Sequence, residues 1–182
     1  MKGGSHRAKG WKGMEYLWAP WRMDYILGKK KSGCFFCRNL KAKKSKEHLI
    51  LYQGETVFVV MNKYPYTHGH LMVVPKRHCL NLEQLNNDEL KELFDLLKTS
   101  VRVLKASFHP HGFNIGMNIG KMGGAGEAHL HLHIVPRWAG DTNFMPVIGK
   151  TKIISEYLEK TYEKLRSAFM ELLRKKGVRK GG

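Results

Sequence analysis

Three histidines recur at every second position in the stretch His129-Leu130-His131-Leu132-His133-Ile134-Val135. Alternation of this kind predicts a half-buried strand, on which every second side chain lies on the same face. The imidazoles of His129, His131 and His133 would then project together, with the aliphatic residues between them facing a core. Burying three imidazoles is costly unless each has a partner. The row therefore predicts a site of chemistry rather than ordinary packing.

The central histidine is the natural nucleophile of such a row. An imidazole nitrogen can attack phosphorus and form a phosphoramidate, which divides one displacement into two easier steps. A second histidine can donate to the non-bridging phosphate oxygens or to the leaving group. His131 has a neighbour on either side, so we expect His131 to attack and an adjacent histidine to assist.

A glycine-rich connection, residues 120–126, stands directly before the row. Such a segment can bring backbone N–H groups close to an anion. It lacks the Gly-Lys-Ser/Thr ending of a P-loop and no helix follows it, so by itself it is also consistent with a flexible turn. Its position beside the histidines favours a phosphate-binding turn.

Cys34 and Cys37 form a Cys-x-x-Cys pair, which is half the ligand set of a tetrahedral zinc ion. His78 and His129 are the candidates for the other two ligands, and they would connect the metal to the histidine row. A redox pair is the alternative, but no thioredoxin-like βαβ pattern accompanies the cysteines. We therefore expect zinc at these four residues.

Two further groups carry less information. Cys79 stands alone and is expected to pack, since three cysteines do not make a disulfide framework. The segment His109-Pro110-His111 has a metal-binding spacing, but its proline and the following glycine are typical of a loop that leads into a strand. We expect a structural role for it.

The composition is that of a globular domain, with 42% hydrophobic and 26% charged residues in 182 positions. The longest apolar runs are too short to span a bilayer, and no secretory signal is visible, so we expect a cytoplasmic protein. The formal net charge of +17 is consistent with a lysine-rich solvated surface or with a polyanionic ligand. No helix-turn-helix or zinc-finger pattern accompanies it, and a nucleic-acid partner is not expected.

The elements that must position these residues are predicted from periodicity. Strands are expected at 49–52, 56–61, 70–75, 113–117 and in the histidine segment, and a turn at 33–37. Helices are expected at 88–107, capped by Asn86 or Asn87, and at about 154–176. This order predicts an α+β fold: a mostly antiparallel sheet of about five strands with one long helix and a C-terminal helix. A single domain would cover 14–176, between a disordered tail at 1–13 and a basic tail at 177–182.

The histidine segment resembles the signature of the histidine triad (HIT) superfamily of nucleotide hydrolases and transferases. The resemblance extends to Asn62 through the Gly69-His70 pair and the Leu-Met-Val-Val-Pro that follows, and to Asn118-Ile119-Gly120 with Gly124. Within the superfamily, the Cys-x-x-Cys pair, residues 17–26, Tyr64-Pro65-Tyr66 and residues 136–145 are most similar to the bacterial diadenosine tetraphosphate phosphorylase-like branch.

The resemblance implies a HIT-like fold and a role for each matching residue. His131 would form a covalent nucleotidyl-histidine, His133 would bind the α-phosphate, and His129 would orient its neighbours or bind zinc. The implied nucleotide-binding residues are Asn62 at the ribose, His70, and the phosphate turn with Asn118, Gly120, Gly124 and Ala125. Related galactose-1-phosphate uridylyltransferases bind zinc through a comparable set, which supports Cys34, Cys37, His78 and His129. A homodimer or higher oligomer is also implied.

Ala125 departs from the pattern, since many triad enzymes have glutamine after the turn glycine. The expected reaction is cleavage of a dinucleoside polyphosphate at the α-phosphorus, with phosphate discharging the intermediate. Water or a sugar phosphate as the acceptor would instead make the protein a hydrolase or a uridylyltransferase-like enzyme. A protein that binds nucleotide or RNA without catalysis is the remaining alternative.

Overall fold

The computed structural model describes residues 33–42, 44–141 and 156–175. The tails predicted at 1–13 and 177–182 lie outside the described residues, as does the aromatic segment 17–26. Within the described part of the chain, no helix combines the length and the apolar character that crossing a membrane requires.

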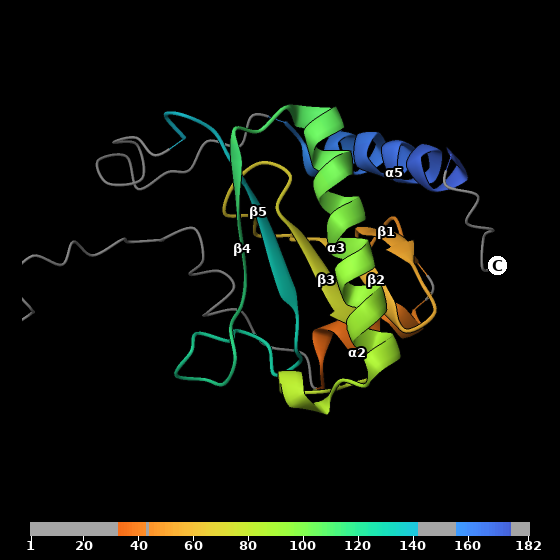
Figure 1. Cartoon of the computed structure of the whole chain (residues 1–182), viewed down its shortest axis with the longest axis vertical. Helices are drawn as coiled ribbons and strands as arrows, with labels where there is room; N and C mark the ends of the chain where they lie inside the picture. Colours follow the sequence, from red (N-terminus) through yellow and green to blue (C-terminus); the bar gives the residue numbers. More distant parts are fainter. Residues whose placement is uncertain (1–32, 43, 142–155, 176–182) are drawn as a thin grey trace, which may run out of the picture.

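Five antiparallel strands form a single sheet (Figure 1). Their order across the sheet is β1-β2-β3-β5-β4, and their bounds are β1 (Ile50–Gln53), β2 (Val57–Met61), β3 (Leu71–Pro75), β4 (Gly112–Met117) and β5 (Leu132–Arg137). The predicted α+β class with a five-stranded antiparallel sheet is confirmed. Four of the five predicted strands agree with the structure to within one residue at each end; the histidine segment does not.

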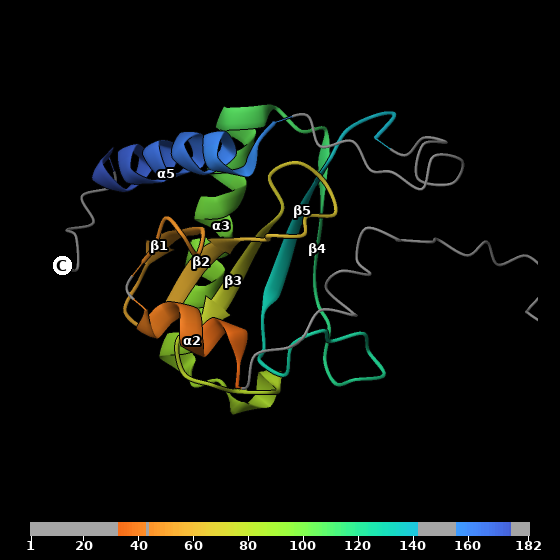
Figure 2. The same cartoon turned by 180° about the vertical axis from the view of Figure 1, so that it is seen from behind.

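Helices cover both faces of the sheet. Helix α3 (Asn87–Phe108) and helix α5 (Leu158–Lys175) pack on one face, and the short helix α2 (Phe35–Lys41) lies on the other (Figures 1 and 2). Every residue of β2 and β3 is buried, as expected for central strands covered on both sides. The core under α3 and α5 includes Leu51, Val59, Val73, Leu93, Leu104, Leu165 and Phe169.

Helix α3 begins and ends with local signals. The Asn86 side chain accepts the Glu89 N–H at 2.9 Å, and the Glu89 carboxylate accepts the Asn86 N–H at 3.0 Å, which completes a capping box. The helix ends at Phe108, and the backbone of the cap residue His109 is left-handed with φ of 49°. His111 Nδ1 accepts the Ala139 N–H at 2.9 Å. The cap predicted at Asn86 and the structural role of the segment that contains His109 and His111 are confirmed.

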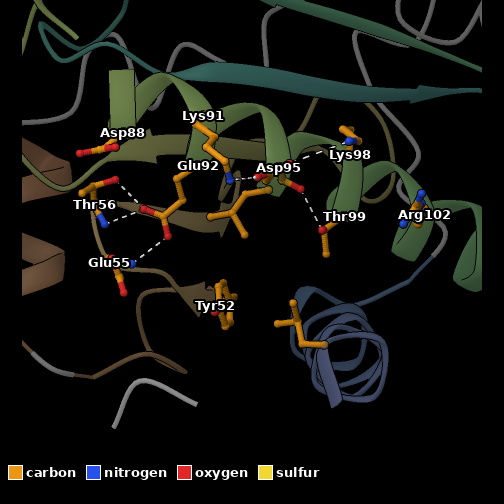
Figure 3. A pocket seen from close by; sticks show the side chains of 12 residues that line it. Tyr52, Glu55, Thr56, Asp88, Lys91, Glu92, Asp95, Lys98, Thr99 and Arg102 are labelled. Carbon is orange, nitrogen blue, oxygen red and sulfur yellow. Dashed lines mark hydrogen bonds and ion pairs between the residues drawn. The ribbon is translucent and has the colours of Figure 1, made fainter. Parts of the chain in front are cut away.

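Glu92 connects α3 to the turn between β1 and β2. Its carboxylate accepts the N–H groups of Glu55 and Thr56 at 2.8 and 2.6 Å (Figure 3). It also accepts the Val57 N–H at 3.1 Å. Burial alone would raise the pKa of Glu92, but the hydrogen bonds outweigh burial and the pKa lies below its usual value. A Cβ at Gly54 would overlap this carboxylate. A side chain at this position would therefore displace the carboxylate from its hydrogen bonds to the turn.

The segment 33–37, which the sequence predicts to be a turn, contains the start of a helix. Phe35–Lys41 form α2, which has no side-chain hydrogen bond at its N-terminal cap. A helix of seven residues has little intrinsic stability, and this one is held because Phe36 and Asn39 are buried. The turn prediction is wrong, since packing against the sheet rather than a local sequence signal forms the helix.

The histidine segment is also only partly a strand. β5 begins at Leu132, so His129 and His131 precede it. The neighbouring strand β3 ends at Pro75, which has no N–H to donate, and the Pro75 carbonyl oxygen lies 2.9 Å from the ring nitrogen Nε2 of His129. The Leu130 N–H donates instead to the Cys79 carbonyl at 2.7 Å. The prediction of a strand over the whole segment is wrong at its start, because the β3–β5 ladder ends before it reaches His131.

Candidate active site and metal centre

The three histidines still lie in one row. The Phe36 ring lies against both His129 and His131, at centroid distances of 5.5 and 5.1 Å. The His131 and His133 ring centroids are 4.6 Å apart. The core under α3 and α5 takes the alternate residues, Leu130, Leu132 and Ile134. The alternation of sides predicted from the sequence is therefore present, although the backbone is extended strand only from Leu132 onward.

The hydrogen bond at His131 fixes which of its nitrogens is reactive. Its Nδ1 lies 2.7 Å from the carbonyl oxygen of His129. A carbonyl can only accept, so Nδ1 carries the proton and Nε2 keeps its lone pair. Burial lowers the pKa of His131 below its usual value, which favours the neutral ring. This is the tautomer and charge that a nucleophilic imidazole needs.

A chain of hydrogen bonds fixes His133 in the opposite tautomer, with its proton on Nε2. The Tyr66 N–H donates to Nδ1 of His70 at 3.1 Å, so the proton of His70 is on Nε2. His70 Nε2 lies 2.9 Å from Nδ1 of His133, which therefore accepts. The remaining proton of a neutral His133 is on Nε2. The row thus places a ring with a free lone pair, His131, next to a ring that donates.

His70 itself is buried, with 1% of its surface exposed. Its ring stacks on Tyr66 at a centroid distance of 4.8 Å, and the Asn62 amide lies 3.3 Å from its Nδ1. The structure thus places His70 behind His133, where it can act through that ring. A direct contact of His70 with nucleotide stays a prediction.

Two cysteines and a second histidine surround His129, the first histidine of the row. One ligand atom from each of Cys34, Cys37, His78 and His129 lies within 4.8 Å of every other. Around His129 Nδ1, the distances are 3.2 Å to Cys34 Sγ, 3.6 Å to Cys37 Sγ and 3.3 Å to His78 Nδ1. The four residues predicted from the sequence are brought together. Cys34 and Cys37 come from the N-terminal cap and the first turn of α2, His78 from the segment after β3, and His129 from the segment before β5.

These residues fit a zinc ion by both spacing and chemistry. Ligand atoms bound to one tetrahedral zinc at usual bond lengths lie about 3.3–3.8 Å apart, close to the distances around His129. The Nε2–H of His129 donates to the Pro75 carbonyl, which leaves Nδ1 unprotonated toward the cluster, as second-shell hydrogen bonds do in metal sites. Burial raises the pKa of the Cys34 thiol to about 11. A cation bound here would displace that proton.

The contacts that bring α2 to the histidines were not visible in the sequence. The Phe35 N–H donates to the Glu127 carboxylate at 3.0 Å, which holds the first turn of α2 against the segment that leads to His129. Phe36 completes the contact with its ring. The only sequence signal for Phe36 is its place between the two cysteines, and Glu127 gives none.

The segments predicted to bind nucleotide lie at the edges of the row. Asn62 Oδ1 accepts the Tyr64 N–H at 2.9 Å. By the register of Met117 with Leu132, Asn118 follows β4 opposite His131, and its amide donates to the Gly124 carbonyl at 3.4 Å. Asn118 therefore lies beside the histidine row, and contacts of Asn62 and Asn118 with nucleotide stay predictions.

The glycine-rich turn is closed by its own backbone. Gly120 and Gly124 have positive φ of 71° and 84°, conformations that favour glycine. The N–H groups of Gly123 and Ala125 donate to the Gly120 carbonyl, and that of Gly124 to the Lys121 carbonyl, at 3.1–3.2 Å. Phosphate contacts by Gly120, Gly124 and Ala125 stay predictions, and the Gly124 and Ala125 amides would have to exchange partners to make them.

Comparisons with known proteins agree with this geometry. The HIT domain family matches residues 43–140. The chain is 39% identical over 157 residues to the AP-4-A phosphorylase of Mycobacterium tuberculosis, covering 81% of this chain and 80% of that protein. The crystal structure of a hypothetical histidine triad nucleotide-binding protein from Sulfolobus tokodaii superposes with a TM-score of 0.67 at 31% identity, over 82% of this chain and 100% of that one.

A second solved structure bears on the metal centre. A histidine triad family protein from Mycobacterium smegmatis, described as Zn-bound, superposes with a TM-score of 0.65 at 26% identity, over 79% of this chain and 97% of that one. The family match, the phosphorylase relative and the shared fold agree with the histidine row, and this chain therefore belongs to the histidine triad (HIT) family.

Proposed function

We propose that this protein is an enzyme that cleaves dinucleoside polyphosphates, of the diadenosine tetraphosphate type, at the α-phosphorus through a covalent nucleotidyl-His131. Inorganic phosphate then discharges the intermediate. The observation that carries the proposal is the 2.7 Å contact between His131 Nδ1 and the His129 carbonyl, since it leaves Nε2 as a nucleophile. The similarity to an AP-4-A phosphorylase supports the substrate class.

In the first step, the Nε2 lone pair of His131 forms a bond to the α-phosphorus as the bond from phosphorus to the bridging oxygen breaks. The bond electrons leave with the distal nucleotide, ATP in the case of diadenosine tetraphosphate. The positive charge that develops on the His131 ring is stabilised by the His129 carbonyl at Nδ1. The Nε2–H of His133 donates to a non-bridging oxygen, where negative charge accumulates.

In the second step, an oxygen of inorganic phosphate attacks the same phosphorus. The P–N bond breaks, its electrons return to Nε2, and the product is a nucleoside diphosphate. Water in place of phosphate would give a nucleoside monophosphate, and a sugar phosphate would give a nucleotide sugar. The chemistry of the row is the same in all three cases, so the acceptor decides the type of enzyme.

Product analysis tests the proposal. Diadenosine tetraphosphate is incubated with the protein, with and without inorganic phosphate, and the nucleotides are separated. ADP and ATP formed only with phosphate are expected. AMP and ATP without phosphate would identify a hydrolase, and turnover that requires a sugar phosphate would identify a transferase. No turnover together with tight, steeply salt-dependent RNA binding would favour a non-catalytic protein.

We further propose that Cys34, Cys37, His78 and His129 hold a structural zinc ion. Four protein ligands leave no open coordination position, so the ion would supply a cross-link between α2 and the histidine row rather than a reactive group. Metal analysis of protein purified without chelator should find about one zinc per chain. A Cys34→Ala variant that keeps full zinc occupancy would contradict the site.

We also propose a homodimer, and the open edge of the sheet is where a second copy fits. β4 is the end strand in the sheet order, and Ile115 on it is 46% exposed. An unpaired strand edge is a template for pairing with another strand. Sedimentation of the wild type and of Ile115→Lys should show a dimer and a shift toward monomer, respectively. A monomeric wild type would contradict the proposal.

A further inference from the structure

Phe36 lies at the junction of the metal centre and the histidine row. It is the second residue of α2, between Cys34 and Cys37 in the chain, and only 3% of its surface is exposed. On the side of the sheet its ring meets Phe58 at a centroid distance of 6.4 Å. It belongs to a small apolar cluster with Ile50, Phe58, Val60, Met72 and Val74. The ring is therefore fixed by the sheet as well as by its own helix.

The same ring contacts two of the three histidines. It meets His129 edge-on at 5.5 Å and His131 at 5.1 Å with an interplanar angle of 49°. The His133 ring also contacts His131, at a centroid distance of 4.6 Å and an interplanar angle of 72°. The proposed nucleophile is thus held between a hydrocarbon ring and a donor imidazole.

A single hydrogen bond does not determine the direction of the attacking nitrogen. In the described part of the chain, the hydrogen bond of the His131 side chain is the one from Nδ1 to the His129 carbonyl. A ring held at one atom can still tilt about that contact, and Nε2 then moves, since it lies on the other side of the ring. Packing by neighbouring rings removes this freedom, because aromatic rings prefer particular offset or edge contacts.

Phe36 cannot move independently of the cysteines. Cys34 precedes α2 and Cys37 lies within its first turn, so ligands that tie these thiols to His78 and His129 also fix the helix that carries Phe36. Without such a tie, α2 is a seven-residue helix with no side-chain cap and little stability of its own.

We propose that Phe36 is a positioning residue for the nucleophile: its ring orients His131, and the metal centre acts on the reaction by holding Phe36 in place. This inference rests on the proposed function of His131. It assigns to the Cys-x-x-Cys helix a role in the reaction that the four ligands alone do not suggest.

The matched variants are Phe36→Leu and Phe35→Leu. Both replace a ring of α2 by an aliphatic side chain, but Phe35 contacts Phe36 and, in the described part of the chain, no histidine ring. For Phe36→Leu we expect the rate of nucleotidyl-His131 formation in single turnovers to fall about tenfold to a hundredfold, with KM and zinc content near wild type. For Phe35→Leu we expect a rate near wild type. Equal rates in Phe36→Leu and wild type would overturn the inference.

A spectroscopic measurement on wild-type holoprotein does not depend on how well a variant folds. With ¹³C-labelled histidine, we expect nuclear Overhauser contacts between the ring protons of Phe36 and His131, and a ring-current shift of the His131 signals that Phe36→Leu abolishes. Removing zinc with a chelator should broaden or shift the His131 signals while circular dichroism still reports a folded chain. His131 signals unchanged by Phe36→Leu or by chelation would overturn the inference.

The two proposals can fail separately. If wild-type protein forms no covalent nucleotidyl-histidine, the proposed function is wrong whatever the ring contacts show. If wild type forms it and Phe36→Leu forms it equally fast, the function holds and Phe36 has only a packing role.

Discussion

The two faces of the sheet are built from different kinds of side chains. Under α3 and α5 the core is a continuous cluster made chiefly of aliphatic and aromatic residues. Under α2 the apolar cluster is small, and beside it lie the histidine row and the thiols of the candidate metal site. Imidazole and thiol groups need specific partners when buried, whereas aliphatic groups need only close packing. The first face can therefore supply most of the stability, while the second holds reactive groups at defined angles.

This comparison predicts that substitutions on the two faces separate activity from stability. A change in the row should remove turnover and leave the fold nearly intact. A change in the large core should lower the stability of the fold and leave turnover per folded molecule nearly unchanged. The following variants test this separation, beginning with the largest effect.

His131→Ala should lower the turnover rate about 10⁴-fold or more, as loss of a nucleophile does in other covalent enzymes. Nucleotide affinity should stay near that of wild type, because binding uses other groups. Steady-state kinetics and calorimetric titration with a non-hydrolysable analogue measure the two quantities. If the variant keeps substantial turnover, His131 is not the nucleophile.

Leu165→Ala should cost about 2–5 kcal/mol in the free energy of unfolding, the usual range for a buried leucine. Leu165 is fully buried in α5 within the large core, far from the groups that react. Urea titration followed by circular dichroism measures the loss. Turnover per folded molecule should be unchanged, and a parallel loss of turnover would mean that the two faces are coupled.

His70→Phe should lower kcat about a hundredfold, within the range that a positioned acid or base contributes, with little change in KM. The variant keeps an aromatic ring but removes the donor that fixes the tautomer of His133. Tyr66→Phe is the matched control, since the residue contributes its backbone N–H to this chain of hydrogen bonds. Equal losses in both variants would assign the effect to packing instead.

Glu92→Gln should have the smallest effect, about 1 kcal/mol at neutral pH. Hydrogen bonds to a charged group contribute more than this when buried, but partial exposure of the carboxylate reduces the value. Because the pKa of Glu92 is lowered in the folded protein, its contribution is present above the pKa of the unfolded chain. It is lost as the pH falls through the folded value. The stability difference between variant and wild type should therefore shrink in acid, and a constant difference would contradict this origin.

The sequence predicted the fold and the side chains that the structure brings together, for physical reasons that can be named. Alternation of His with Leu and Ile placed three imidazoles opposite the core, because side chains of an extended segment alternate whether or not the ladder is complete. The thiol pair indicated a metal because thiolates and imidazoles are zinc ligands. These signals depend on residue type and spacing alone.

The parts that the sequence did not predict depend on backbone atoms of distant residues. The ring of His129 is bonded to the backbone carbonyl of Pro75, and the tautomer of His133 is set by the N–H of Tyr66 through His70. Helix α2 forms because Phe36 is buried, although its seven residues carry no strong helical signal. Nearly every residue has a backbone carbonyl and a backbone amide, so residue type does not indicate which of these groups makes a contact. Such contacts become visible only in the three-dimensional structure.

The ring of His129 lies in the cluster with the two thiols, and its main-chain oxygen accepts the hydrogen bond from Nδ1 of His131. One residue thus contributes to the cysteine–histidine cluster through its side chain and to the hydrogen bond of His131 through its backbone. A family member that dispensed with the metal could exchange the side chain at this position and still keep the oxygen. If the proposed metal site holds an ion of larger radius, we expect the His129 ring to shift and the carbonyl that bonds to His131 to move with it.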